Sequence, residues 1–365
     1  MPAFLYALLL LCSATLTAYG KDSVVFRFET VGDSRFAPED HGPWPEEHVW
    51  LQNSAVVNRF IDAMEPLHPQ LFVFNGDMIY GYNANRAELD REYAYWRGMM
   101  SQLFAHKIYL LPVAGNHELE LKSRNALGMV VKHTVPASED AWRASMGDLV
   151  LDVDLWHELT GMSVHAWNLD NTPSSILDGI HSDQRQLTYS FDTGDIHIAV
   201  INTDPAGFDS SAPWHWLDQD LRSARQRGMK HLFVFGHKMA FPYEPAHRPL
   251  ILQGHESGLE VHPQVRDAFW NVIEDNHATY FCGHEHVMHI SQPWKSKGGT
   301  AWQVIVGSGG SPFSVRTNES DDPMDFMYAW ADVQVYASGR VHIRILGFSS
   351  LTDPIHVLKS WYLTP

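Results

Sequence analysis

The sequence has very little cysteine, with only Cys12 and Cys282 among its 365 residues. Residues 1–20 hold a short apolar run and end in small residues, which is typical of a secretory signal peptide. Removal of that segment would leave Cys282 alone, in a mature chain that we expect to begin near Lys21. This excludes an intrachain disulfide and a zinc site built from several thiolates. Because Cys282 ends an apolar run, we interpret it as a small buried hydrophobic residue.

Long hydrophobic runs are also missing. The run from Phe4 to Leu11 falls well short of the roughly 20 residues that span a bilayer. No Lys or Arg precedes it, which leaves a retained membrane anchor as the alternative interpretation. The short run and the ending Ala18-Tyr19-Gly20 favour cleavage. We therefore expect a secreted or periplasmic protein that has no stable membrane insertion once the signal peptide is removed.

Positive charge is scarce as well. Lys and Arg number 26 against 43 Asp and Glu, which gives a formal net charge of -17. This balance argues against a general electrostatic attraction to nucleic acid or to an anionic membrane surface. An anionic substrate would have to be held by local cations.

What the chain does contain is a regular alternation of strand-like runs and amphipathic helical patterns. The expected strands are 24–31, 71–75, 108–114, 187–192, 195–202, 230–235, 278–282, 302–306, 328–336 and 341–348, and the expected helices are 45–65, 86–103, 214–228 and 262–277. This order predicts an α/β fold with parallel strands joined by helical crossovers. We assign the strands of the back half to a second sheet.

Residues 120–188 interrupt this alternation. The segment contains several tryptophans and histidines but no strong period. We predict an insertion, and two interpretations stay open: a cap or substrate wall, or a peripheral elaboration that only packs. The motifs described next run from residue 33 to residue 286 and must meet in one site. Residues 21–365 are therefore predicted to form one domain.

Short polar motifs follow five of the apolar runs. They are Gly32-Asp33, Gly76-Asp77, Gly115-Asn116-His117-Glu118, Gly236-His237 and Gly283-His284-Glu285-His286. A single Gly-Asp after a strand is usually a turn or a helix cap, but here the placement recurs at strand ends, where open α/β sheets form their ligand crevice. Carboxylate oxygen and imidazole nitrogen are donors that hard or borderline metals prefer. The motifs together predict a metal site.

The order of these motifs resembles that of the calcineurin-like metallophosphoesterase superfamily. The match spans most of the mature chain, and Tyr189-Ser190-Phe191-Asp192 followed by Ile201-Asn202-Thr203 is similar to the middle hairpin of that family. The resemblance implies a four-layer α/β/β/α sandwich of two mixed sheets with a dinuclear metal site that cleaves phosphoesters. It also implies attack on phosphorus by a hydroxide held between the two ions.

The resemblance assigns roles to individual residues. It implies that Asp77 bridges the two ions and that His117 is the general acid that protonates the leaving alkoxide. The other ligands that it implies are Asp33 and His286 on one ion, and Asn116, His237 and His284 on the other.

The first motif departs from the commonest pattern of the family, Asp-x-His, because its third residue is Arg35. A guanidinium has no lone pair for a metal, so we interpret Arg35 as a clamp for an oxyanion. Gly76-Asp77-Met78-Ile79-Tyr80 resembles the Gly-Asp-x-x-Tyr motif of purple acid phosphatases, in which the tyrosine binds a ferric ion. Tyr80 is thus a candidate ligand, with a place on the pocket wall as the alternative. The resemblance implies two metal ions, with iron, manganese or zinc as candidates.

The sequence therefore predicts an exported metal-dependent phosphoesterase that acts on small-molecule phosphoesters. Two alternatives stay open: a phosphodiesterase, and a catalytically lapsed metal-binding interaction protein of the same fold. Asn116 and His117 together argue against the lapsed protein, because a structural site has no need of an acid beside a ligand. For Lys238, next to His237, we expect an exposed lysine, with contact to the substrate as the alternative.

Overall fold

A computed structural model of the chain describes residues 22–36, 52–249 and 257–363. The predicted signal peptide at residues 1–20 and the beginning of the helix predicted over 45–65 lie outside the described residues. No helix within the described ranges combines the length and the apolar character needed to cross a bilayer.

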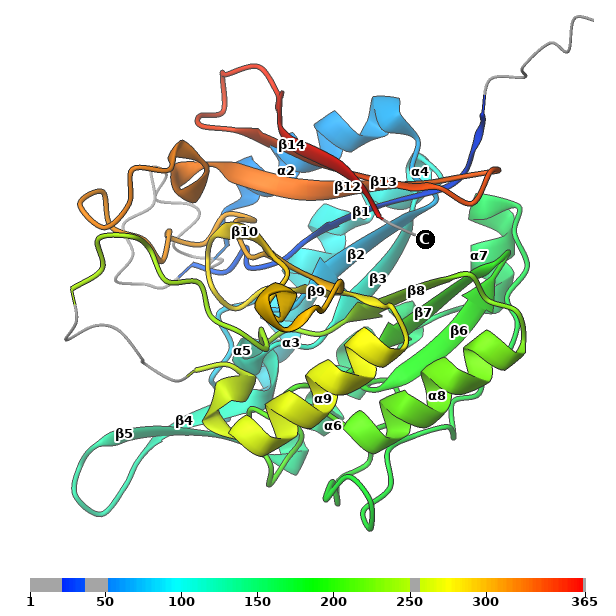
Figure 1. Cartoon of the computed structure of the whole chain (residues 1–365). Helices are drawn as coiled ribbons and strands as arrows, with labels where there is room; N and C mark the ends of the chain where they lie inside the picture. Colours follow the sequence, from blue (N-terminus) through cyan, green and yellow to red (C-terminus); the bar gives the residue numbers. More distant parts are fainter. Residues whose placement is uncertain (1–21, 37–51, 250–256, 364–365) are drawn as a thin grey trace, which may run out of the picture.

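Two six-stranded sheets form the centre of the molecule (Figure 1). The strands of the first sheet, in the order β14-β13-β12-β1-β2-β3, are β14 His356–Leu363, β13 Val341–Phe348, β12 Tyr328–Tyr336, β1 Val24–Val31, β2 Leu71–Asn75 and β3 Tyr109–Val113. Strands β1, β2 and β3 are parallel, whereas β12, β13 and β14 continue the sheet in antiparallel pairing.

The second sheet is mixed too. Its strands, in the order β10-β11-β9-β8-β7-β6, are β10 Met288–Ser291, β11 Trp302–Val306, β9 Thr279–Cys282, β8 His231–Phe235, β7 Ile196–Val200 and β6 Tyr189–Thr193. The four inner strands are parallel, and β6 and β10 pair antiparallel at the two edges.

Most of the helices that the structure describes lie on the outer faces of the two sheets. The helices are α2 Ser54–Met64, α3 Arg86–Met100, α4 Gln102–Ala105, α5 Asn116–Leu119, α6 Pro136–Met146, α7 Val153–Thr160, α8 Trp214–Gln226 and α9 Pro263–Asp275. Buried side chains of α2, α3 and α6 pack on the first sheet, and those of α8 and α9 pack on the second. The predicted four-layer α/β/β/α sandwich is confirmed.

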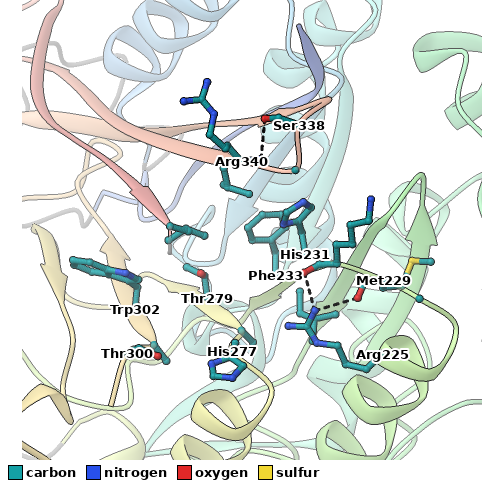
Figure 2. A pocket seen from close by; sticks show the side chains of 18 residues that line it. Arg225, Met229, His231, Phe233, His277, Thr279, Thr300, Trp302, Ser338 and Arg340 are labelled. Atoms are coloured by element: carbon teal, nitrogen blue, oxygen red, sulfur yellow. Dashed lines mark hydrogen bonds between the residues drawn. The ribbon is translucent and has the colours of Figure 1, made fainter. Parts of the chain in front are cut away.

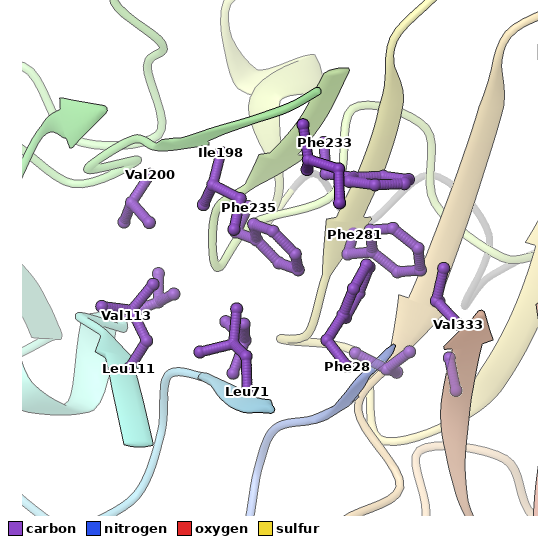
Figure 3. Packing of buried hydrophobic residues seen from close by; sticks show 14 of the residues in the cluster. Phe28, Leu71, Leu111, Val113, Ile198, Val200, Phe233, Phe235, Phe281 and Val333 are labelled. Atoms are coloured by element: carbon purple, nitrogen blue, oxygen red, sulfur yellow. The ribbon is translucent and has the colours of Figure 1, made fainter. Parts of the chain in front are cut away.

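The two sheets meet face to face through apolar side chains (Figure 3). Phe28 of β1 lies against Phe233, Phe235 and Phe281 of the second sheet, with ring centroids 5.0, 5.6 and 5.7 Å apart. All four rings are buried, and truncation of such a phenylalanine typically costs about 3–5 kcal/mol. This packed interior holds the carboxyl ends of strands from both sheets at fixed positions.

The assignment of all late strands to the second sheet was wrong. Strands β12, β13 and β14 return to the first sheet, where β12 pairs antiparallel with β1 from Val24 opposite Tyr336 to Thr30 opposite Ala331. Sequence position does not decide this pairing, because β1 offers a free edge to any strand that the chain brings back.

Residues 120–188 form a protruding hairpin, two helices and a long irregular stretch. The hairpin joins β4 Glu120–Arg124 to β5 Val130–Thr134, and it projects from the body of the molecule (Figure 1). Helices α6 and α7 follow it. A role of this segment as cap or substrate wall stays a prediction.

Candidate metal centre

The polar motifs meet where loops leave the carboxyl ends of β1, β2, β3, β8 and β9. Three of the predicted ligands, Asp33, Asp77 and His284, have φ values of 65°, 52° and 71°. This left-handed backbone is uncommon for residues other than glycine and carries a cost of about 1 kcal/mol or more. Backbone strain of this kind is concentrated at functional sites, and here it turns three side chains toward one place.

One half of the centre, which we call the histidine-rich cluster, consists of Asp77, Asn116, His237 and His284. Asn116 Oδ1 lies 2.9 Å from His237 Nε2 and 2.8 Å from His284 Nδ1. The two imidazole nitrogens are 3.2 Å apart, and His237 Nε2 is 3.1 Å from Asp77 Oδ1. Four donor atoms therefore converge on one point.

The other half, which we call the acidic cluster, consists of Asp33, Asp77 and His286. Its ligand atoms all lie within 4.8 Å of one another, and Asp77 belongs to both halves. His286 Nε2 is 3.7 Å from Asp33 Oδ1. The turn over residues 283–286 sends His284 into one cluster and His286 into the other, as the two-residue spacing allows when the chain is not extended.

Backbone carbonyls fix the orientation of two of the imidazoles. His237 Nδ1 donates to the carbonyl of Asn75 at 2.8 Å, and His286 Nδ1 donates to that of Pro312 at 2.6 Å. In both rings this leaves Nε2 facing the centre. Metal-bound histidines in proteins are held by hydrogen bonds of the same kind.

Glu118 ties the loops of the centre together. Its carboxylate accepts hydrogen bonds from the backbone N–H groups of Asp77, Met78, Ile79 and Gly115. Burial raises the pKa of Glu118 to about 7. This role of Glu118 was not predicted from the sequence, although its place at the end of the Gly-Asn-His-Glu motif is a signal that could have indicated it.

Electrostatics in the centre are dominated by burial and by pairs of opposite charge. Burial alone would raise the pKa of Asp77, but His117 and His237 lower it well below its usual range. Burial likewise opposes a charge on His237, yet the neighbouring carboxylate of Asp77 raises its pKa to about 10. Burial raises the pKa of Asp33 well above normal. Asp33 and Asp77 are both buried, so positive charge close by is needed to stabilise them as carboxylates.

The donor set fits metal ions. A tetrahedral ion with bonds of about 2.1 Å has ligand atoms about 3.4 Å apart, close to the spacings within the histidine-rich cluster. Two imidazole nitrogens that face each other at 3.2 Å cannot both keep a proton between them. A cation bound by both lone pairs removes this conflict, and Asp77 lies where its carboxylate can serve two ions.

His117 lies beside the clusters, with Nε2 3.7 Å from Asp77 Oδ2. Its Nδ1 donates to the carbonyl of Tyr80, which turns the other ring nitrogen toward the centre. The ring of Tyr82 packs on the imidazole at a centroid distance of 3.9 Å. The phenol oxygen of Tyr82 also accepts hydrogen bonds from Asn116 Nδ2 and Lys132 Nζ. Tyr82 and Lys132 were not predicted from the sequence, because neither belongs to a motif.

Arg35 and Tyr80 have different relations to the centre. Arg35 Nη2 is 3.3 Å from His286 Nε2, and its Nε is 3.8 Å from Asp77 Oδ2, so the guanidinium borders the acidic cluster. Tyr80 supplies its carbonyl to His117, and its ring centroid is 6.0 Å from that of His117. Coordination by Tyr80 stays a prediction.

The expectation of an exposed Lys238 was wrong. The residue is 3% exposed, and its Nζ lies 2.5 Å from Asp204 Oδ1 and 3.3 Å from Glu120 Oε1. Two buried carboxylates stabilise the ammonium group, although burial by itself opposes the charge. A single sequence position next to a histidine carries no information about such distant partners.

A hollow of about 870 Å³ lies elsewhere in the described part of the chain (Figure 2). Its lining includes residues at the amino ends of β8, β9 and β11, whereas the candidate ligands follow the carboxyl ends of these sheets. Its cations already have partners: Lys230 pairs with Asp195, Arg340 with Asp22, and Arg225 donates to backbone carbonyls. The hollow is therefore separate from the candidate metal centre.

Comparisons with known proteins agree with this geometry. A family model described as calcineurin-like phosphoesterase matches residues 40–288, which is more than half of the chain. The matched range contains all the predicted ligands except Asp33. No curated protein sequence matches the chain.

Two solved structures share the fold. Purple acid phosphatase PPD1 from yellow lupin (Lupinus luteus) seeds is 13% identical with a TM-score of 0.57, and the alignment covers 94% of this chain and 54% of the lupin chain. A dimetal phosphatase from Danio rerio is 14% identical with a TM-score of 0.53, covering 94% and 99% of the two chains. This chain thus spans about half the length of the lupin protein. With the family model matching from residue 40 to residue 288 and the strand-end motifs gathered in one centre, the chain belongs to the calcineurin-like phosphoesterase family.

Proposed function

We propose that this protein is a metal-dependent phosphoesterase that hydrolyses small phosphate esters at the centre formed by the two clusters. The observation that carries the proposal is the convergence of donor atoms into two groups that share Asp77. Membership of the calcineurin-like phosphoesterase family supports it.

The residues that would hold the ions follow from the two clusters. Asp77, Asn116, His237 and His284 would bind one ion, and Asp33, Asp77 and His286 the other. When bound, two such ions polarise the phosphoryl group and lower the pKa of water so that it attacks phosphorus near neutral pH. The protein fixes this geometry through Glu118 and through the carbonyls behind His237 and His286.

His117 would supply the proton for the leaving group. Its Nδ1 is held by the carbonyl of Tyr80, so only Nε2 can give a proton to an oxygen in the centre. Burial lowers the pKa of His117 well below its ordinary value in the free protein. A bound phosphoester adds negative charge within a few ångströms and raises that pKa again, which favours the acid form when substrate is present.

Arg35 would bind a nonbridging phosphoryl oxygen. Its guanidinium borders the acidic cluster and is the cation positioned to offset charge that grows on the oxygens during transfer. The chain has a net charge of -17 and few cations, and this role would place one of those cations at the reacting group.

The identity of the ions is a narrower proposal. The set of oxygen and imidazole donors suits iron, manganese or zinc. The structural likeness to a purple acid phosphatase, together with the Gly-Asp-x-x-Tyr motif, supports iron at the acidic cluster with Tyr80 as an added ligand. The signal-like residues 1–20 support export to the periplasm or the exterior.

The decisive experiment is metal analysis of the protein purified from its own host, followed by assays with matched phosphomonoesters and phosphodiesters. We expect about two metal ions per chain and hydrolysis that a chelator abolishes and metal restores. Full metal loading without hydrolysis of any ester would favour the catalytically lapsed alternative. Preference for diesters would assign the same centre to a phosphodiesterase.

A further inference from the structure

The hairpin formed by β4 and β5 carries a cationic face in an otherwise acidic protein. Between residues 121 and 134 there are two lysines and one arginine and no acidic residue. The strand register places Lys122 opposite Lys132 and Arg124 opposite Val130, so all three cations lie on one face of the hairpin. Like charges opposite each other destabilise a hairpin, so the pairing of Lys122 with Lys132 does not itself stabilise the two strands.

The tip of the same hairpin is apolar and exposed. Leu127 is 82% exposed, Met129 55% and Val130 47%. Exposed apolar residues that occur singly need no explanation, but three within four positions form a patch.

The turn holds this patch in a defined shape. Asn125 and Met129 close the loop through a backbone hydrogen bond, and Asn125 Oδ1 accepts from the N–H groups of Leu127 and Met129. Gly128 has a φ of 78°, as expected for the last residue of a three-residue hairpin loop. Leu127 is thus presented outward by an ordered turn.

From these two features we infer that the hairpin adsorbs to the surface of an anionic lipid bilayer. Apolar side chains flanked by Lys and Arg are the composition of elements that lie in the headgroup region with their apolar part in the acyl boundary. A soluble polyanion would use the cations but would leave Leu127 and Met129 in water. The inferred contact is peripheral and involves no membrane-spanning segment.

The overall charge of -17 does not prevent this contact. A strand of five residues at about 3.4 Å per residue carries the tip roughly 17 Å from its base. Charges in solution are screened over about 8 Å at physiological ionic strength. The acidic body is therefore more than one screening length from a surface that the tip touches.

The base of the hairpin connects this surface to the metal centre. Lys132 Nζ donates to the phenol oxygen of Tyr82 at 2.8 Å, and the backbone of Tyr82 bonds to that of His117 at 3.1 Å. Adsorption would therefore hold the centre about one hairpin length from the surface, where it would meet phosphoesters that project from that surface. This last step depends on the proposed function, whereas the binding itself does not.

The test is sedimentation of the full mature protein with vesicles of phosphatidylcholine alone and with added phosphatidylserine. We expect binding only to the anionic vesicles and weaker binding as salt increases. The double variant Lys122→Glu/Arg124→Glu should bind at least about 25-fold more weakly, because each basic residue near such a surface contributes about fivefold. The variant Leu127→Asp/Met129→Asp should lose about tenfold or more while keeping its activity on a soluble ester.

Two controls make the comparison specific. Lys295→Glu/Lys297→Glu changes the net charge equally at a remote turn, and Ile176→Asp changes an apolar residue that is 90% exposed in another loop. Both should bind as the unchanged protein does. Equal binding to the two kinds of vesicle, or loss of binding in the controls as well, would overturn the inference. If the protein binds soluble polyphosphate and the variant Leu127→Asp/Met129→Asp binds it equally well, the cationic face would be assigned to a soluble polyanion instead. Because binding is measured without turnover, an inactive enzyme would not alter these results.

Discussion

The two halves of the metal centre differ in the donors that they offer. The histidine-rich cluster has two imidazoles and an amide oxygen beside the shared Asp77, with the donors about 3 Å apart. The acidic cluster has two carboxylates and one imidazole, with His286 Nε2 3.7 Å from Asp33 Oδ1, and the guanidinium of Arg35 borders it. One half is rich in nitrogen donors, whereas the other is rich in oxygen donors.

This difference indicates that the two halves suit different ions. Imidazole donors favour borderline metals such as zinc, and carboxylates favour harder ions. Arg35 repels a cation at the acidic cluster, and only three ligands from motif residues are available there. We therefore expect a higher metal affinity at the histidine-rich cluster, and the following predictions test this comparison from the largest effect to the smallest.

Asp77→Asn should weaken metal binding at both halves of the centre, because a neutral amide bridges two cations poorly. We expect loss of measurable hydrolysis and of at least one metal equivalent, measured by assay and by metal analysis. Asp195→Asn is the matched control, since Asp195 also follows a glycine in a turn but lies away from the centre. If Asp77→Asn kept wild-type activity and full metal loading, Asp77 would be only a turn residue with no role in metal binding.

His117→Ala should leave both halves loaded with metal and slow turnover by about 100- to 10,000-fold. The loss should be greatest for esters with poor leaving groups, because only these need a proton as the bond breaks. Turnover is compared across a series of leaving groups, with His181→Ala as an exposed control. An equal loss along the whole series would remove His117 from the role of acid.

Arg35→Met should affect only the acidic half. We expect kcat/KM to fall by about 10- to 100-fold, the range of a charged hydrogen bond worth about 1.5–3 kcal/mol. Metal affinity at that half should rise at the same time, because a neighbouring positive charge is gone. Isothermal titration with metal and steady-state kinetics measure both quantities, and Arg222→Met on α8 serves as the control. Unchanged kinetics and unchanged metal binding would place Arg35 outside the reaction.

Tyr80→Phe should have the smallest effect on hydrolysis, below about tenfold, and a specific effect on colour. Free phenol loses its proton near pH 10, so a phenolate ligand requires an acidic ion such as ferric iron. Iron-loaded protein should absorb visible light, and Tyr80→Phe should bleach it. Tyr82→Phe is the matched control and should stay coloured, because burial raises the pKa of Tyr82 and disfavours its phenolate. Colourless, fully active wild-type protein would place Tyr80 on the pocket wall.

Most of the fold could be predicted from the sequence because its strands are local apolar runs. The strands around Val24–Val31, Leu71–Asn75 and Trp302–Val306 were predicted with the bounds that the structure shows. The edge strand β14 was missed, since its residues are mostly exposed and show no clear alternation. Sheet membership was wrong for β12 and β13, because pairing with β1 joins segments about 300 residues apart.

For the centre, the sequence by itself was enough to name the side chains that the structure gathers in one place, because each motif couples a glycine-enabled turn to a polar side chain at the end of an apolar strand. Only the tertiary structure decided which of them lie together in one cluster, since the distances between His237, His284 and Asn116 depend on how two sheets pack. It also decided contacts that no motif predicts. Glu118 binds backbone N–H groups of neighbouring loops, Tyr82 packs on His117, and Lys238 lies between two buried carboxylates. Such contacts depend on distances between segments that are remote in sequence, and a local sequence pattern cannot predict those distances.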